Sequence, residues 1–213
     1  MLATGCRPPH TLLAPSPEAL NEVEGYASLK ITRNGETARS KFSFLIERSF
    51  RSRVSVADIM GRTVAEIYIG EREAYFVLLR EKVYWKGMPD EIIEKFLGYR
   101  LSLPEMTGIL CGWWTGTSET QQEGEEWTFE RDREGRRVGG RRADLEFKVR
   151  KFFPGSPVPR QVDFQSISCR GSISIMNLNF NNPVAENVFN MVFLKNSSPV
   201  RWEEIEKILR RED

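Results

Sequence analysis

Apolar and polar residues alternate along most of the chain after residue 22, which is the pattern of half-buried β-strands. The predicted strands of the first half cover residues 23–32, 41–47, 54–56, 64–69, 74–79 and 82–85. Asn34-Gly35 lies between the first two strands and is a strong signal for a two-residue hairpin turn. Short connections between successive strands predict an antiparallel meander that forms a curved sheet or barrel.

The alternation stops at Pro89, and two short helices are predicted before it resumes. Pro89 suits the first position of the first helix, and Gly98 can end it. Ser102 and Glu105 are placed as a capping box at the start of the second helix. Each helix has one apolar stripe, made of Ile92, Ile93, Phe96 and Leu97 in the first and of Met106, Ile109, Leu110, Trp113 and Trp114 in the second.

Strands resume in the second half at residues 126–131, 143–152, 158–167, 171–179 and 188–194. The stretch 131–142 holds six arginines and is expected to be a polar turn, either a solvated hairpin tip or a contact for anionic lipid headgroups. Ser198 and Pro199 predict the start of a last helix. Its apolar face would hold Trp202, Ile205, Ile208 and Leu209.

The two inserted helices admit two interpretations. A curved sheet that is not closed must cover its concave apolar face, and apolar helices are suited to cover it. In the first interpretation they complete an ordinary hydrophobic core. In the second they form a lid over a cavity that receives a long apolar ligand. An elongated cavity between sheet and helices would favour lipid handling, whereas a filled interior would favour a scaffold.

Length and composition place the chain among globular proteins. Its 213 residues fit one domain with appendages, and a hydrophobic fraction of 40% suffices for a core. The formal net charge of +1 provides no global field that would recruit nucleic acid. The sequence holds no apolar run as long as a membrane span.

Candidate catalytic chemistry is scarce. His10 is the only histidine, which argues against histidine-based triads, histidine-rich zinc sites and the usual general base. Cys111 and Cys169 have no metal-binding spacing. They either form a disulfide or stay buried free thiols, and we expect free thiols because nothing in their spacing demands a disulfide. We therefore expect no enzyme, no metal and no cofactor.

The first residues, Leu2-Ala3-Thr4-Gly5-Cys6, place small residues directly before a cysteine, like the lipobox of bacterial lipoproteins. The basic and apolar regions of a secretory signal are missing upstream, which fits a trimmed signal or a misassigned start. The alternative is an accidental Gly-Cys pair. Four prolines in residues 7–20 then predict an extended spacer.

The predicted turn Asp58-Ile59-Met60-Gly61-Arg62 has large apolar residues where turns normally carry polar ones. Met60 either projects into solvent, where a flexible thioether side chain suits contacts with varied apolar partners, or folds back with Ile59 under the sheet edge.

Several segments, in this order, resemble the outer-membrane lipoprotein receptor family LolB and the related periplasmic carrier LolA, over about residues 23–193. They are Val23-Glu24-Gly25-Tyr26-Ala27, Phe42-Ser43-Phe44, Ile59-Met60-Gly61, the helix from Leu101-Ser102-Leu103-Pro104 to Leu110-Cys111-Gly112-Trp113, and Val158-Pro159-Arg160-Gln161-Val162. Ile59-Met60-Gly61 falls where the family has a Pro-Leu-Gly loop. Ile59 thus replaces the proline, and whether the loop is as rigid as in the family stays an open question.

The resemblance implies a mainly β fold, an antiparallel unclosed barrel covered by short lid helices. The C-terminal helix predicted from the residues goes beyond the usual pattern of the family. The resemblance divides the chain into a lipoprotein signal remnant (1–6), a Pro-rich tether (7–22), a lipid-binding half-barrel (23–196) and the C-terminal helix (197–213). It implies lipidation of Cys6 and membrane insertion by Ile59, Met60 and Gly61. The acyl-chain cavity and lid would comprise Phe42, Phe44, Ile92, Phe96, Leu97, Met106, Ile109, Leu110 and Trp113.

The function implied by the resemblance is acceptance of the acyl chains of lipoproteins and their insertion in the outer membrane. The protein would be a monomer, anchored at the periplasmic side of that membrane and served by a LolA-like carrier. Two alternatives stay open. One is a lipoprotein that carries another lipid or a glycolipid, and the other is a non-enzymatic envelope scaffold.

Overall fold

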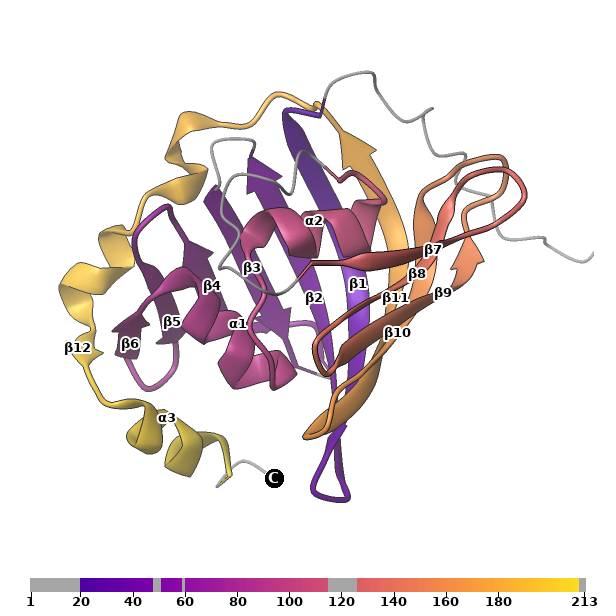
Figure 1. Ribbon diagram of the computed structural model, residues 1–213. Coiled ribbons are helices and arrows are strands. Elements are labelled where there is room, and N and C mark those ends of the chain that lie inside the picture. The colour runs from indigo at the N-terminus through magenta and orange to yellow at the C-terminus, as the bar shows by residue number, and fades with distance from the viewer. Residues whose placement is uncertain (1–19, 48–50, 59, 115–125, 211–213) are drawn as a thin grey trace, which may run out of the picture.

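The computed structural model describes residues 20–47, 51–58, 60–114 and 126–210. Its main feature is one curved twelve-stranded sheet, ordered β12-β6-β5-β4-β3-β2-β1-β11-β10-β9-β8-β7 (Figure 1). The strands are β1 (Glu22–Arg33), β2 (Glu36–Glu47), β3 (Arg51–Ala57), β4 (Thr63–Ile69), β5 (Ala74–Leu78), β6 (Val83–Gly87), β7 (Thr128–Arg131), β8 (Arg137–Arg142), β9 (Leu145–Phe152), β10 (Pro159–Gln165), β11 (Cys169–Phe180) and β12 (Ser198–Pro199).

Neighbouring strands are antiparallel except for β12, which pairs with β6 in parallel. The sheet begins at β12 and ends at β7 without closing, so the predicted fold class is confirmed. The tip between β1 and β2 is the predicted hairpin turn, with positive φ angles of 52° at Asn34 and 84° at Gly35. Both values suit the turn that matches the twist of paired strands.

Two helices lie on the concave face of the sheet, as the sequence predicts. α1 (Pro89–Leu97) begins with proline and ends at Gly98, which has a left-handed φ of 81°. α2 (Leu103–Cys111) begins with the predicted capping box, in which the backbone N–H of Ser102 donates to the Glu105 carboxylate at 2.7 Å. Trp113 was expected within this helix, but α2 ends before it because Gly112 adopts a left-handed φ of 72°.

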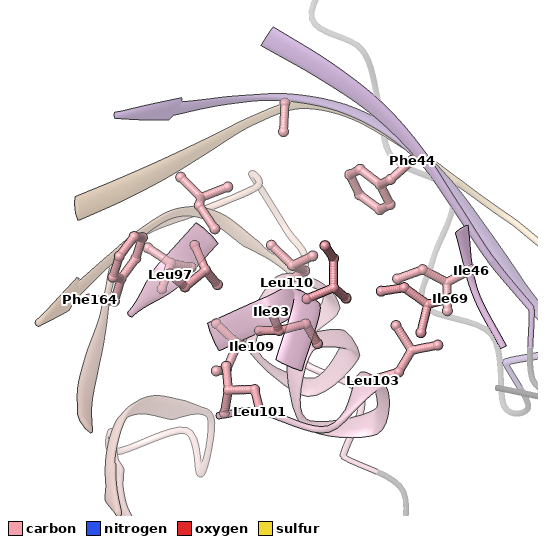
Figure 2. Close-up of a cluster of buried hydrophobic side chains, with 14 of the residues drawn as sticks. Phe44, Ile46, Ile69, Ile93, Leu97, Leu101, Leu103, Ile109, Leu110 and Phe164 are labelled. Carbon is pink, nitrogen blue, oxygen red and sulfur yellow. The ribbon is translucent and has the colours of Figure 1, made fainter. Parts of the chain in front are cut away.

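The hydrophobic core fills the space between the concave sheet face and the helices. Figure 2 shows Phe44 from the sheet, Leu97 from α1, and Ile109 and Leu110 from α2 in this space. Its strand members include Val23, Ala27, Phe44, Ile46, Ala65, Phe76, Phe147, Val162, Ile173 and Ile175. The apolar side chains at alternate strand positions point to the concave face and pack against the apolar stripes of both helices. This packing explains the alternation seen in the sequence.

The C-terminal part of the chain wraps from one face of the sheet to the other (Figure 1). Residues 181–197 contain the 3₁₀ turns η1 (Glu186–Phe189) and η2 (Val192–Asn196), and Met191 and Leu194 pack on the outer face against a second apolar cluster. β12 then joins the edge at β6, and α3 (Trp202–Leu209) brings Trp202 and Ile205 into the main core.

Three sequence predictions are wrong in this part of the fold or near it. Residues 188–194 form 3₁₀ turns rather than a strand, since β12 already occupies the sheet edge at β6. Ser198 and Pro199 make that edge strand, where a proline is tolerated, and α3 starts only at Trp202. The arginine-rich stretch was expected to be a turn, but it contains the strand β8. Gly139 and Gly140 lie in the middle of β8, and because they have no side chains the alternation of apolar and polar residues is absent there.

Within the described ranges, no helix combines the length and apolar content that crossing a bilayer requires.

Candidate functional site

The side chains expected to form the acyl-chain cavity and lid lie together in the core. Figure 2 labels four of the buried ones, Phe44, Leu97, Ile109 and Leu110. Ile92 is also buried, and the half-buried members packed against the cluster are Phe42, Phe96, Met106 and Trp113. β2, α1 and α2 thus bring these residues to one apolar interior, although they are up to 71 positions apart in the sequence (Phe42 to Trp113).

This interior is occupied by the protein's own side chains, and two clefts in the structure lie elsewhere. One cleft, of about 370 Å³, lies where residues 182–188 cross the outer face of β1, β2 and β3. The other, of about 310 Å³, lies over β1, β9, β10 and β11 and is lined by charged residues such as Lys30, Lys148 and Arg170. Neither of these two clefts opens between the sheet and the helices.

α2 is fastened to the sheet by a buried carboxylate. Glu105 is 8% exposed and accepts a hydrogen bond from the indole N–H of Trp127 at 2.7 Å. It also pairs with the guanidinium of Arg142 on β8, which donates to the backbone carbonyl of Arg100 at 2.6 Å. One ion pair therefore ties α2, the connection from α1 and the β7–β8 hairpin to one another.

α1 is held near its C-terminal end by contacts of two kinds. The Phe96 ring lies 5.0 Å from the ring of Phe76 on β5. At the C-terminal end, the hydroxyl of Ser168 donates to the carbonyl of Gly98 at 3.2 Å, and the Cys169 thiol donates to the carbonyl of Leu97. Aromatic contact and hydrogen bonds together fix this helix over the sheet.

The turn between β3 and β4 exposes Met60, which is 74% solvent-accessible. The Asp58 carboxylate accepts hydrogen bonds from the backbone N–H groups of Met60 at 2.8 Å and Arg62 at 2.9 Å. It also accepts one from the Arg62 side chain at 2.8 Å, while Gly61 supplies the left-handed φ of 79°. Met60 projects into solvent on a turn that Asp58 fastens, so a proline is not needed to hold its shape. Ile59 lies outside the described residues.

Hydrogen bonds from the backbone and side chain of Arg62 lower the pKa of Asp58 below its ordinary value of 3.8. The carboxylate is therefore ionised at neutral pH, in the form that accepts all of these hydrogen bonds.

The same turn occurs a second time in the chain with a polar tip. Between β7 and β8, the Asp132 carboxylate accepts from the backbone N–H groups of Glu134 and Arg136, both at 3.0 Å, and from the Arg136 side chain at 2.7 Å. Gly135 has a φ of 78°. The shared pattern is Asp-x-x-Gly-Arg, and Glu134 stands at the position of Met60. The turn thus forms equally with an exposed glutamate, so its geometry does not require the methionine.

Ile167 is a second exposed apolar residue on a turn and is 91% solvent-accessible, although the alternation pattern predicts it inside a strand. It follows Ser166, whose backbone N–H donates to the carbonyl of Cys169 at 2.7 Å and closes the β10–β11 turn. β3 and β10 run in the same direction, so the turns that follow them lie at the same end of the sheet. Serines on both sides of Ile167 are the signal that would have found this turn.

The arginine-rich hairpin is only in part a solvated tip. Arg137 lies over the rings of Phe129 at 4.5 Å and Trp114 at 5.4 Å, and its burial lowers its pKa. Arg142 takes part in the ion pair with Glu105. Arg133, at the turn itself, is exposed. Two of the arginines therefore stabilise the aromatic cluster beside α2.

Cys111 and Cys169 are buried free thiols, as we expected. Burial raises the pKa of Cys111 to about 12, so its thiol stays protonated and unreactive. Among the residues that the structure describes, no group of three metal-ligating side chains lies together. Cys6 and most of the predicted tether are outside those residues.

No family model matches the sequence, and no curated protein matches it. Solved structures do match. The chain is similar to a DUF1329 family protein from Desulfovibrio piger, with a TM-score of 0.57, 8% identity, and coverage of 83% of this chain and 92% of that one. It also matches a LolA superfamily protein from Nitrosomonas europaea, with a TM-score of 0.48, 10% identity, and coverage of 82% and 92%.

A third match is a domain described as an outer membrane lipoprotein-sorting protein, from Vibrio parahaemolyticus, with a TM-score of 0.47, 10% identity, and coverage of 84% and 93%. At these identities the likeness concerns the fold. The chain therefore shares its overall fold with the DUF1329 family protein.

Proposed function

We propose that this protein is a membrane-anchored acceptor of lipoproteins, which takes their acyl chains into its apolar interior and inserts them in the outer membrane. The observation that carries the proposal is the exposed Met60 turn. The chain builds the same turn with Glu134 at the tip, so an apolar tip is not a requirement of folding. Exposing a methionine to water is unfavourable, which points to an apolar partner for this turn.

The interior supports the acceptor role by its chemistry. Its walls are aliphatic and aromatic side chains, and α1 and α2 cover it. Burying an acyl chain is worth about 0.8 kcal/mol per CH₂, on the order of 10 kcal/mol for a long chain. Transfer then needs only a more apolar site at each step, from a LolA-like carrier to this interior and from there to the bilayer. No covalent chemistry is required.

The proposed anchor at Cys6 is compatible with membrane contact at the Met60 end of the sheet. β1 starts at Glu22, close to the tether, and its 12 residues extend over roughly 40 Å toward the end that carries Met60 and Ile167. The segment from Cys6 to Leu20 can span at most roughly 45 to 50 Å. An anchored monomer can therefore place both turns against the membrane that holds its own acyl chains, on the periplasmic side of the outer membrane.

The variant Met60→Glu tests the proposal, because it recreates the tip chemistry of the Asp132 turn and is expected to fold normally. The assay follows a fluorescent tripalmitoylated lipopeptide from the purified protein to phospholipid vesicles. We expect the variant to bind the lipopeptide like wild type but to release it into vesicles at least tenfold more slowly. Met60→Leu is the control and should transfer normally. Transfer by Met60→Glu at the wild-type rate would contradict the proposal.

A second candidate function is an envelope scaffold, and the filled interior is the observation that favours it. A scaffold would bind no acyl chain, so it predicts no retention of the lipopeptide by wild-type protein. The third possibility is a carrier of another lipid or a glycolipid, which mass spectrometry of lipid that copurifies with the protein distinguishes from an acceptor of lipoproteins.

A further inference from the structure

The C-terminal helix α3 occupies one end of the apolar interior. Its Trp202 ring lies 5.7 Å from Phe76, 5.3 Å from Trp85 and 5.8 Å from Phe96. Trp202 is 7% exposed, and Ile205, one turn later, is fully buried. In Figure 1, α3 ends the yellow part of the chain on the side where α1 lies. These two side chains thus fill a space walled by β5, β6 and α1.

Besides these ring contacts and Lys95 of α1, whose Nζ lies 5.5 Å from the centre of the Trp202 ring, few contacts hold α3 in that place. Trp202 and Ile205 are its only buried residues, while Ile208 and Leu209 are half-buried. The connection to the sheet is the two-residue strand β12, extended by a backbone hydrogen bond from Val200 to the carbonyl of Tyr84 at 2.8 Å. The first residue before the helix, Arg201, provides no side-chain cap.

The other helices are held more firmly. α2 buries seven of its nine residues and is tied to the sheet through Glu105 and Arg142. α1 buries three residues and is fastened at its C-terminal end by Ser168 and Cys169. Of the three helices, α3 therefore buries the fewest residues in the interior.

We infer that the space filled by Trp202 and Ile205 is where an acyl chain first enters, and that α3 leaves it to admit the chain. The inference rests on the proposed function for its ligand. Phe76, Trp85 and Phe96 would then line an apolar slot that is open at the edge of the sheet. A flexible alkyl chain fits such a slot, because ring faces and edges offer contact without polar groups that need partners. The exposed side of α3 carries Glu203, Glu204 and Lys207, so the released helix keeps a charged face toward water.

In this inference, the three aromatic walls of the slot stay covered whether or not a ligand is bound. Without ligand, Trp202 covers the three aromatic walls and prevents their exposure to water. With ligand, the acyl chain provides the same cover. Only molecules in which α3 is undocked can bind an acyl chain, so the apparent affinity is the intrinsic affinity multiplied by the fraction of undocked molecules. Weakening the docking of α3 should therefore raise the apparent affinity.

The test measures binding of cis-parinaric acid, a fluorescent long-chain fatty acid, to the full-length protein. Trp202→Ala should bind it roughly tenfold more tightly than wild type, since the docked state is weakened. Trp114→Ala is the matched control, because Trp114 also contacts three rings, those of Trp127, Phe129 and Phe147, in the cluster beside α2. We expect its affinity to stay within about twofold of wild type. Circular dichroism establishes that each variant is folded.

A second measurement needs no variant. Trypsin can cut after Arg201 and Lys207 only when α3 is undocked, so a saturating amount of the fatty acid should accelerate these cuts at least fivefold in wild-type protein. Equal affinities of wild type and Trp202→Ala, with cleavage unchanged by the fatty acid, would overturn the inference and leave the proposed function intact. Absence of binding in both proteins would overturn the inference and the proposed function together.

Discussion

Replacing Glu105 by alanine tests whether one buried ion pair holds α2 in place against the sheet. The side chains of Glu105 and Arg142 are 11% and 19% exposed, so neither charge is well solvated. Removing one member of such a pair leaves the other without its counterion and costs about 3–5 kcal/mol. Arg142 keeps its bond to the carbonyl of Arg100, which places the expected loss near the lower end, about 3 kcal/mol.

The loss is measured as the change in the free energy of unfolding in urea. Glu105→Gln keeps hydrogen-bonding groups while it removes the charge, and we expect it to lose about 1–2 kcal/mol. A double-mutant cycle with Arg142→Ala should give a coupling energy above about 1 kcal/mol. Asp163→Ala provides the control, because its pair with Arg150 is more exposed, at 34% and 52%, and should contribute less than about 1 kcal/mol. A loss below about 1 kcal/mol for Glu105→Ala, or zero coupling, would refute the reasoning.

Two further predictions concern the turns at one end of the sheet. The pKa of Asp58 is lowered in the folded state, so the hydrogen bonds it accepts persist above its ordinary pKa of 3.8 and are lost only as pH falls through the lower folded value. NMR titration of the Met60 and Arg62 amides should therefore give a midpoint below 3.8, and a midpoint at or above that value would contradict this account. Ile167→Ser should leave the unfolding free energy within about 0.5 kcal/mol of wild type, since the side chain is 91% exposed. In a Cys6→Ser background it should weaken flotation with phospholipid vesicles, and equal flotation would remove Ile167 from the proposed membrane contact.

The sequence was sufficient for the parts of the fold that local signals determine. Alternation located the strands of the meander, and Ser102 with Glu105 marked the start of α2. Both signals depend only on residues close together in the sequence, so they can be recognised without knowing the tertiary structure. β8 was missed because its two glycines remove the alternation. The lack of a side chain at Gly140 is explained by the rings of Phe147 and Phe129, which lie where its Cβ would be.

Long-range features of the site could not be predicted in this way. The chain crosses the outer face at Met191 and returns to the inner face at Trp202. This path depends on which edge of the sheet is free. The role of Glu105 beyond its helix cap depends on Arg142, which is 37 positions away. The rigid Met60 turn was predictable in principle, since Asp-x-x-Gly-Arg occurs at Asp58 and again at Asp132.

Photo-crosslinking with an acyl chain tests the central claim most directly. A tripalmitoylated lipopeptide with a diazirine near the end of one chain is bound to the wild-type protein and irradiated, and modified peptides are identified by mass spectrometry. We expect crosslinks to the inner walls of β5, β6 and α1, at or near Phe76, Trp85 and Phe96. Crosslinks confined to the outer face of the sheet, or none above those of an unlipidated peptide, would contradict it.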